Sequence, residues 1–336
     1  MASTELRLQP EEIVSTLYRA ILERQPDAVG FSYFLQQIRE GVPLDQIIRE
    51  FLSSEELSSK GQVQLGGDPL STNAIDLDLS PSQRQYLWEH VAKIWHQLGR
   101  DEPYWSVAEV EEFRIANISQ AGAVERFYES GRRDIERAEG YLSRNGRRFP
   151  ERGVCVDYGC GVGRTTLWLA QRCERVLAVD VSQAHLDLAR AALAARGVNN
   201  VDFFLLRSRQ DLEALRGIDL FHSILVLQHN PPPLIADILA TAFAGLNKDG
   251  AAFFQVPTFG PGYSWRYTSY VAETMPYQQA EMHVLPQSVV FALAAKAGCI
   301  PLEIEPDFYS GMPHWISNTF VFAKSDAGGL PFHGGR

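Results

Sequence analysis

Short apolar runs alternate with helical patterns from residue 154 to residue 256, and this alternation constrains the fold more than any other feature. The apolar runs, rich in Val, Ile, Leu and Phe, are 154–157, 176–181, 201–206, 220–227 and 251–256. The helical patterns between them are 165–171, 183–195, 211–215 and 234–246. Strands that alternate with helices form a parallel sheet covered on both faces. We therefore predict an α/β domain, completed by strands at 302–304 and 319–323 that include one antiparallel edge.

A glycine-rich turn follows the first predicted strand. Gly159, Gly161 and Gly163 stand at alternate positions after Asp157, just before a predicted helix. Glycine lets a backbone turn tightly and approach a ligand closely, and the free N–H groups of a helix start favour an electronegative group. A dinucleotide fingerprint would require a further glycine where Arg164 stands, which argues against a nicotinamide enzyme.

A second acidic residue, Asp180, ends the next predicted strand. A carboxylate at that place can accept hydrogen bonds from both ribose hydroxyls of an adenosine ligand. The role of Asp157 is open between a direct cofactor contact and the organisation of the glycine turn.

These segments resemble the class I S-adenosylmethionine-dependent methyltransferases. The similar stretches are Asp157-x-Gly159-x-Gly161-x-Gly163, 179–182, 219–229 and 246–250. The resemblance covers about residues 120–325. It implies a Rossmann-like methyltransferase sheet with helices on both faces and S-adenosyl-L-methionine as the cofactor.

The resemblance also implies a set of cofactor-binding residues. Gly159 and Gly161 would pass under the methionine part, while Leu227 and Gln228 would flank it. Asp180 would hold the ribose, and a lid would come from the helix that precedes the core. The complete predicted set is Asp157, Gly159, Cys160, Gly161, Gly163, Asp180, Val181 (on the adenine), Asp211 or Leu212 (at the adenine edge), Leu227, Gln228 and Tyr128 (in the lid).

Two histidines are candidates for a general base. Transfer of a methyl group to a hydroxyl requires removal of its proton, and histidine suits that task near neutral pH. His229 follows the fourth predicted strand, and His283 lies in the long aromatic segment 258–286. We predict His283 as the base ahead of His229. The alternative is that each histidine only braces its loop.

The segment 258–286 is also the predicted acceptor cap. Loops of this length inside a domain are usually functional, and Tyr and Trp side chains suit a sugar ring or an aromatic acceptor. The candidate acceptor contacts are Tyr263, Trp265, Tyr270 and His314. The alternative is that the aromatic side chains fill the core of the cap itself.

The N-terminal region predicts a separate helical domain. Apolar residues recur at helical spacing over residues 11–57, with breaks at 24–27 and 41–43. The region also carries Tyr18-Arg19, Leu22, Arg24, Pro26-Asp27, Gly30, Tyr33, Gly41, Ile48, Phe51, Ser54 and Glu55. This set resembles a short bacterial domain of unknown function that is often attached to glycan-related and secreted proteins, and the resemblance implies a docking module. We expect this domain at 1–60, a linker at 61–79, and a helical lead-in with the lid at 80–150. The methyltransferase core follows at 151–325, and a flexible tail at 326–336.

Composition limits the partners and the compartment. The net charge of −10 disfavours nucleic acid, which binds clustered Lys and Arg. The four cysteines form no C-x-x-C pair, so we expect reduced thiols and no metal. No apolar run approaches the ~20 residues that span a bilayer, and we predict a cytoplasmic protein.

The expected activity is methylation of a sugar, glycan or other small-molecule hydroxyl. N- and C-methylation stay open, as does a methyltransferase-like domain that binds without turnover. An aminopropyl transferase of the same fold would require extra acidic residues, and 227–233 has none.

Overall fold

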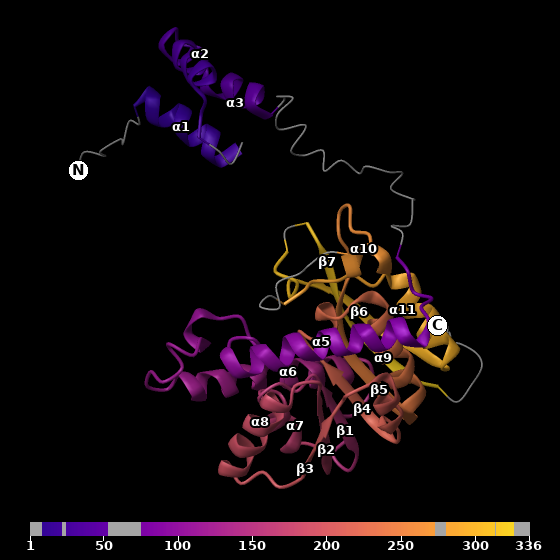
Figure 1. The fold of residues 1–336 in the computed structure, drawn as a ribbon. Coiled ribbons are helices and arrows are strands. Elements are labelled where there is room, and N and C mark those ends of the chain that lie inside the picture. The colour runs from indigo at the N-terminus through magenta and orange to yellow at the C-terminus, as the bar shows by residue number, and fades with distance from the viewer. Residues whose placement is uncertain (1–8, 22–24, 53–74, 273–279, 313, 326–336) are drawn as a thin grey trace, which may run out of the picture. The chain divides into compact units, whose positions relative to one another are not determined.

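The computed structural model describes residues 9–21, 25–52, 75–272, 280–312 and 314–325 (Figure 1). The chain divides into two compact units, Met1–Thr72 and Asn73–Arg336. The predicted tail at 326–336 and the predicted linker up to residue 74 lie outside the described residues.

The described residues of the first unit form three helices. Its helices are α1 (Pro10–Ile21), α2 (Ala28–Arg39) and α3 (Leu44–Leu52). Tyr18 and Phe51 are buried between them, with ring centroids 5.0 Å apart in an edge-to-face contact. A side chain at Gly30 would overlap the Tyr18 hydroxyl, so this glycine permits the close approach of α2 to α1. The unit is held by apolar contacts between short amphipathic helices.

The second unit is built on a seven-stranded sheet, which confirms the predicted α/β, Rossmann-like fold. The strands are β1 (Val154–Tyr158), β2 (Arg175–Asp180), β3 (Val201–Leu205), β4 (Ile218–Ser223), β5 (Leu246–Phe259), β6 (Cys299–Asp307) and β7 (Ile316–Lys324). Their order is β3-β2-β1-β4-β5-β7-β6. β1 to β5 are parallel, whereas β7 is antiparallel to both of its neighbours. The antiparallel strand therefore lies inside the sheet, and β6 forms the edge.

Helices cover both faces of this sheet (Figure 1). The helices of the second unit are α5 (Pro81–Asp101), α6 (Ala123–Arg144), α7 (Thr166–Ala170), α8 (Gln183–Ala195), α9 (Pro232–Gly245), α10 (Tyr267–Ala272) and α11 (Gln287–Lys296). Val156 and Phe221 share a core with α5, α9 and α11. Cys155 and Leu220 face α6 and α7. Successive strand residues thus serve opposite faces, as a doubly covered sheet requires.

Helix α5 begins with a capping box. The Ser80 hydroxyl accepts a hydrogen bond from Gln83 N, and the Gln83 side chain accepts one from Ser80 N. This capping box satisfies two donors at the helix start. The predicted helix 211–215 is instead a short 3₁₀ helix, η2 (Arg209–Ala214), and another, η3 (Leu227–His229), follows β4.

The segment 75–79, part of the expected linker, packs against the core. Ile75 pairs with Trp265 as an isolated β-bridge, and Asp76 N donates to the Trp265 carbonyl at 3.0 Å. The Asp76 carboxylate accepts from Arg266 at 2.6 Å and from Tyr267 N at 3.0 Å. The approach to α5 is therefore tied to the cap segment that begins after β5.

The expectation of four reduced thiols is wrong for two cysteines. Cys155 in β1 and Cys173 form a disulfide, with their Cα atoms 6.4 Å apart. The turn before β2 brings Cys173 back beside β1, which sequence spacing does not reveal. Cys160 and Cys299 are free and buried. Disulfides persist mainly in oxidising compartments, so this pair gives no support to a cytoplasmic location. Among the described helices, none has the length and apolar character needed to cross a membrane.

Candidate cofactor site

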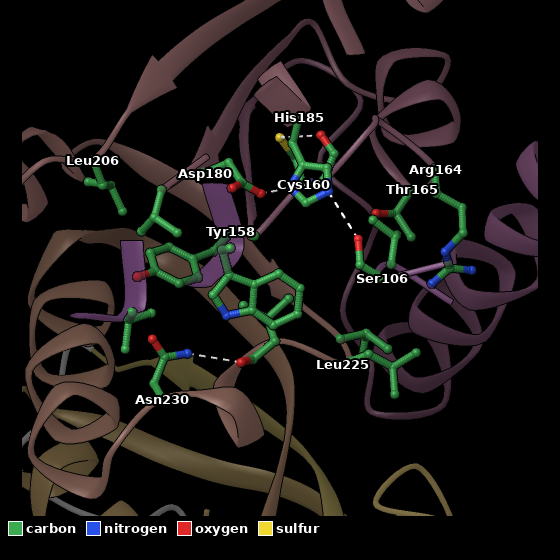
Figure 2. Close-up of a pocket in the computed structure, with 18 residues that line it drawn as sticks. Ser106, Tyr158, Cys160, Arg164, Thr165, Asp180, His185, Leu206, Leu225 and Asn230 are labelled. Carbon is green, nitrogen blue, oxygen red and sulfur yellow. Dashed lines mark hydrogen bonds between the residues drawn. The ribbon is translucent and has the colours of Figure 1, made fainter. Parts of the chain in front are cut away.

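A cavity lies at the carboxyl ends of β1, β2 and β4 (Figure 2). Ligands of open α/β sheets bind at this edge. The turn after β1, the end of β2 and the loop after β4 meet here, and α5 and the segment 106–107 close over them. The lining residues are Val91, Trp95, Ser106, Val107, Tyr158, Gly159, Cys160, Gly161, Arg164, Thr165, Asp180, Val181, His185, Leu206, Ile224, Leu225, Val226 and Asn230.

Two glycines make the floor of the cavity possible. Gly159 has φ +72° and Gly161 has φ +52°, in the left-handed region that other residues rarely adopt. A side chain at Gly159 would overlap Val226, and one at Gly161 would overlap Val107. Both the turn geometry and the close packing of neighbouring segments therefore require glycine.

Asp180 stands at the end of β2 with its carboxylate fixed by the backbone. Oδ2 accepts a hydrogen bond from Gly161 N at 2.8 Å, and Oδ1 accepts one from Ser182 N at 2.8 Å. The side chain lines the cavity and is 7% exposed. A carboxylate has about four acceptor positions, so Asp180 can still accept hydrogen bonds from ligand hydroxyls.

Asp157 does not line the cavity. It is 2% exposed, and its carboxylate accepts from the Thr165 hydroxyl at 3.0 Å and the Thr166 hydroxyl at 2.6 Å. His222 Nδ1 lies 3.1 Å away in β4. These contacts favour the interpretation in which Asp157 organises the glycine turn over the one in which it contacts the cofactor directly.

The remaining predicted cofactor residues divide into two groups. Cys160 and Val181 line the cavity. The others occupy supporting positions outside its lining, namely Gly163, Tyr128, Asp211, Leu212, Leu227 and Gln228.

The supporting positions are well defined. The Tyr128 hydroxyl donates to the Val162 carbonyl at 3.0 Å and braces the glycine turn from α6. The Asp211 carboxylate accepts from Arg207 N at 2.7 Å within its own loop. Leu212 and Leu227 are buried in the main core, and the Gln228 amide pairs with Gln255 at 2.9 Å. Gly163 has φ +84°, and a Cβ there would lie 2.6 Å from Leu193 of α8.

Neither candidate base is among the residues that line the cavity. His229 Nδ1 lies 2.8 Å from the Glu281 carbonyl, and its Nε2 lies 3.2 Å from Gln228 Nε2. Burial lowers the pKa of His229 to about 4. His283 Nε2 lies 2.9 Å from the Glu281 carboxylate, and the Tyr263 hydroxyl lies 2.9 Å from its Nδ1.

Glu281 is the centre of a buried polar cluster in the cap. Its carboxylate accepts from the Tyr270 hydroxyl at 2.7 Å and lies 3.0 Å from Nε2 of His90 in α5. Burial alone would raise the pKa of Glu281, but hydrogen bonds from His283 and His90 lower it to about 2. The cap and α5 are therefore joined through a charged carboxylate.

The four predicted acceptor contacts do not line the cavity. Tyr263 and Tyr270 belong to the Glu281 cluster through their hydroxyls. Trp265 is 4% exposed and packs in the main core. His314 is exposed, with φ +64°, in the loop before β7. Trp265 therefore belongs to the main core of the domain, which differs both from an acceptor contact and from a core of the cap alone.

Several lining residues carry no motif of their own. Trp95 and Val91 come from α5, and their only signal is the helical period. Ser106 Oγ lies 3.1 Å from Nε2 of His185, the third residue of α8, so the two segments meet over the cavity. Burial lowers the pKa of His185, and the Asp180 charge partly offsets this.

Parts of the chain are similar to known proteins. Residues 155–250 match a family model described as a methyltransferase domain, and residues 4–60 match the domain of unknown function DUF4214. The tRNA/tmRNA (uracil-C(5))-methyltransferase of a Nitratiruptor species is 35% identical over 72 residues, which are 21% of this chain and 20% of the relative. The same enzyme of Ectopseudomonas mendocina is 40% identical over 69 residues, 20% of this chain and 19% of the relative. The chain thus spans about a fifth of the length of the curated relatives it matches.

A solved structure of low sequence identity is also similar. Magnesium protoporphyrin IX methyltransferase (ChlM) from Synechocystis PCC 6803, with bound SAM, is 17% identical with a TM-score of 0.43. The similarity covers 67% of this chain and 95% of that chain.

Residues 155–250, which carry the glycine turn and Asp180, are therefore similar to a methyltransferase domain, and S-adenosylmethionine is the cofactor that the sequence resemblance implies. The N-terminal resemblance to a domain of unknown function is likewise confirmed. The cavity fits the cofactor, because the cradle at Gly159 and Gly161 admits close approach and Asp180 offers a fixed carboxylate.

Proposed function

We propose that the protein transfers a methyl group from S-adenosylmethionine to a hydroxyl of a small molecule or glycan. The observation that carries the proposal is the cavity over Gly159, Gly161 and Asp180, three residues of the segment that matches the methyltransferase family model. The cofactor, when bound, supplies an electrophilic methyl group.

The cavity walls suit this chemistry. Asp180 would accept hydrogen bonds from the ribose, and the glycine turn would lie under the methionine part. Val91, Trp95 and Val107 are apolar and close over the turn. They would exclude water from the sulfonium centre, which favours transfer to the acceptor over hydrolysis.

Of the two candidate bases, His283 is better suited to take the proton. Its Nε2 faces the Glu281 carboxylate, so Nε2 carries the hydrogen and Nδ1 accepts one from the Tyr263 hydroxyl. His229 has a pKa of about 4 because it is buried, so it is a weak base near neutral pH. Neither histidine lines the cavity, so the base role requires His283 to approach the bound acceptor.

A nucleic acid acceptor is the second candidate, because both curated relatives are named as tRNA/tmRNA methyltransferases. The net charge of −10 counts against it, since phosphate backbones are bound by clustered cations. The N-terminal unit would serve as a docking module for a protein partner.

The test uses radiolabelled cofactor with three acceptor sets: oligosaccharides, small hydroxyl-bearing metabolites and bulk tRNA. Cofactor binding is first measured by calorimetry on the purified chain. We expect binding, and labelling of an oligosaccharide or small molecule. The His283→Ala variant should lose about 10²–10⁴ in turnover with unchanged cofactor affinity. Labelling of tRNA alone would show that the acceptor is a nucleic acid and not a small molecule or glycan. Absence of cofactor binding would refute the proposed methyltransferase activity.

A further inference from the structure

Arg164 follows the glycine turn directly and lines the cavity, although it is 5% exposed. It is the only lysine or arginine among the lining residues that the structure describes. Figure 2 shows it on the opposite side of the view from Leu206, with Asp180 between them. If Asp180 holds the ribose and the adenine lies toward Leu206, the methionine part of the cofactor extends toward Arg164.

Helix α6 holds the guanidinium of Arg164 in place. Nη1 lies 2.7 Å from the Asp134 carboxylate and 3.4 Å from the Ser130 hydroxyl. A side chain at Gly131 would overlap the Arg164 carbonyl, so the absence of a side chain at Gly131 permits the close contact between α6 and the glycine turn. These contacts give Arg164 a fixed position rather than a mobile one.

The contacts with α6 leave part of the guanidinium unpaired. Nε of Arg164 is buried and has no hydrogen-bond partner among the described residues. A guanidinium has five N–H donors, and buried polar atoms are normally satisfied. The unpaired donor indicates that the native environment of Arg164 includes an acceptor that the chain itself does not provide.

A third element is connected to Arg164 through Asp134. The Tyr309 hydroxyl donates to the other oxygen of Asp134 at 2.9 Å. Tyr309 belongs to the loop between β6 and β7, which joins the sheet at the same edge as the glycine turn. Tyr309 N in turn donates to Asp307 at 3.1 Å, which fixes the start of this loop.

We propose that Arg164 binds the carboxylate of the cofactor's methionine part, and that Tyr309, acting through Asp134, positions the guanidinium. The inference rests on the proposed function. Two arguments support it, charge and position. The methionine part carries a carboxylate, and Arg164 is the cationic side chain of the described cavity lining that lies where the methionine part would end. Arg164 is thus a cofactor-binding residue, and Tyr309 is a positioning residue.

The test compares two ligands by calorimetry: S-adenosylmethionine and its decarboxylated form, which keeps the sulfonium and the amine. The wild-type protein should prefer S-adenosylmethionine. Arg164→Leu should lower that preference roughly 10- to 100-fold, the range for hydrogen bonds to a charged group, with little change for the decarboxylated ligand. Arg164→Lys should restore part of it. The matched control is Arg172→Leu, because Arg172 also pairs with an acid of α6, Glu139 at 3.3 Å, away from the cavity.

The positioning role is tested with Tyr309→Phe, which removes one hydroxyl. The preference for the carboxylate should fall roughly threefold to tenfold, again with unchanged affinity for the decarboxylated ligand. The control is Tyr33→Phe, which removes a similar hydroxyl–carboxylate contact with Glu50 at 2.8 Å in the first unit. A merely structural effect of Tyr309 would weaken both ligands equally, and that result would overturn its role.

The outcomes separate the inference from the proposed function. Equal wild-type affinity for the two ligands would overturn the inference while leaving the cofactor assignment intact. Failure of the wild-type protein to bind either ligand would overturn both. If Arg164→Leu does not fold, the wild-type preference and Tyr309→Phe still decide the matter, because neither requires loss of the buried arginine.

Discussion

Replacement of Asp180 by alanine tests the cofactor site most directly. The carboxylate accepts two backbone hydrogen bonds, from Gly161 and Ser182, each 2.8 Å long. Leaving such donors unpaired costs about 1–3 kcal/mol each, so we expect the variant to lose about 2–6 kcal/mol of unfolding free energy. Loss of the ribose contacts should cost a further ~2–3 kcal/mol in binding, or roughly a hundredfold in affinity.

The assay must separate these two effects. Thermal or urea unfolding measures the first, and calorimetry with S-adenosylmethionine below the unfolding transition measures the second. The matched control is Asp219→Ala. The Asp219 carboxylate also accepts two hydrogen bonds, from Val154 N at 2.8 Å and Asn247 at 2.9 Å, but it lies at the amino end of β4, outside the cavity lining. The Asp219→Ala variant should lose unfolding free energy and keep its affinity for S-adenosylmethionine. Wild-type affinity in Asp180→Ala, or an equal loss in both variants, would refute the assignment.

Three further predictions concern the turn, the boundary of the second unit and the pH dependence. Gly197→Ala should cost about 1 kcal/mol of unfolding free energy, because Gly197 has a φ of +74° and no atom near the added methyl group. Gly161→Ala should cost about 2–4 kcal/mol and lower the cofactor affinity, because its methyl group would also overlap Val107. Equal costs for the two variants would contradict the packing argument. A chain that begins at Asn73 should fold. A chain that begins at Ser80 lacks the contacts of segment 75–79, so its melting temperature should be lower by about 2–4 °C for each kcal/mol of unfolding free energy lost. Equal melting temperatures for the two chains would show that the segment adds no stability. Burial lowers the pKa of His229 from 6.5 to about 4, so the unfolded chain takes up a proton at a higher pH than the folded chain does. The unfolding free energy should therefore fall by up to about 3 kcal/mol as the pH drops from 6.5 to 4. His229→Gln should flatten this pH dependence in urea titrations, and an unchanged dependence would exclude His229 as its source.

The predictions that succeeded rest on signals carried by neighbouring residues. The period of the apolar runs identified the strands and the covered sheet, since burial on both faces requires continuous apolar stretches. The helix at Gln183–Ala195 has the bounds that its pattern predicts, because Ser182 caps its start. The glycine spacing predicted a tight turn, and Gly159, Gly161 and Gly163 all have positive φ.

The predictions about the acceptor side followed residue chemistry, loop length and position along the chain. His283, Tyr263 and Tyr270 are reactive residue types close in sequence, but none of them lines the cavity. His283 and Tyr270 contact the Glu281 carboxylate, and the Tyr263 hydroxyl contacts His283. A side chain's direction depends on which elements pack around it. Glu281 is satisfied by His90 of α5, a partner nearly two hundred positions away in the sequence that no local pattern indicates.

The sequence by itself determined the alternation of strands and helices, the glycine turn, and the acidic residue at the end of β2, because period, φ preference and strand-end position are local properties. Only the tertiary structure decided what closes the cavity. Trp95, Val107 and Arg164 come from three separate segments, and Cys155 meets Cys173 although the glycine turn and α7 lie between them in the sequence. These meetings depend on how the helices pack against the sheet, and long-range packing follows from the fit of whole surfaces rather than from any single stretch of residues.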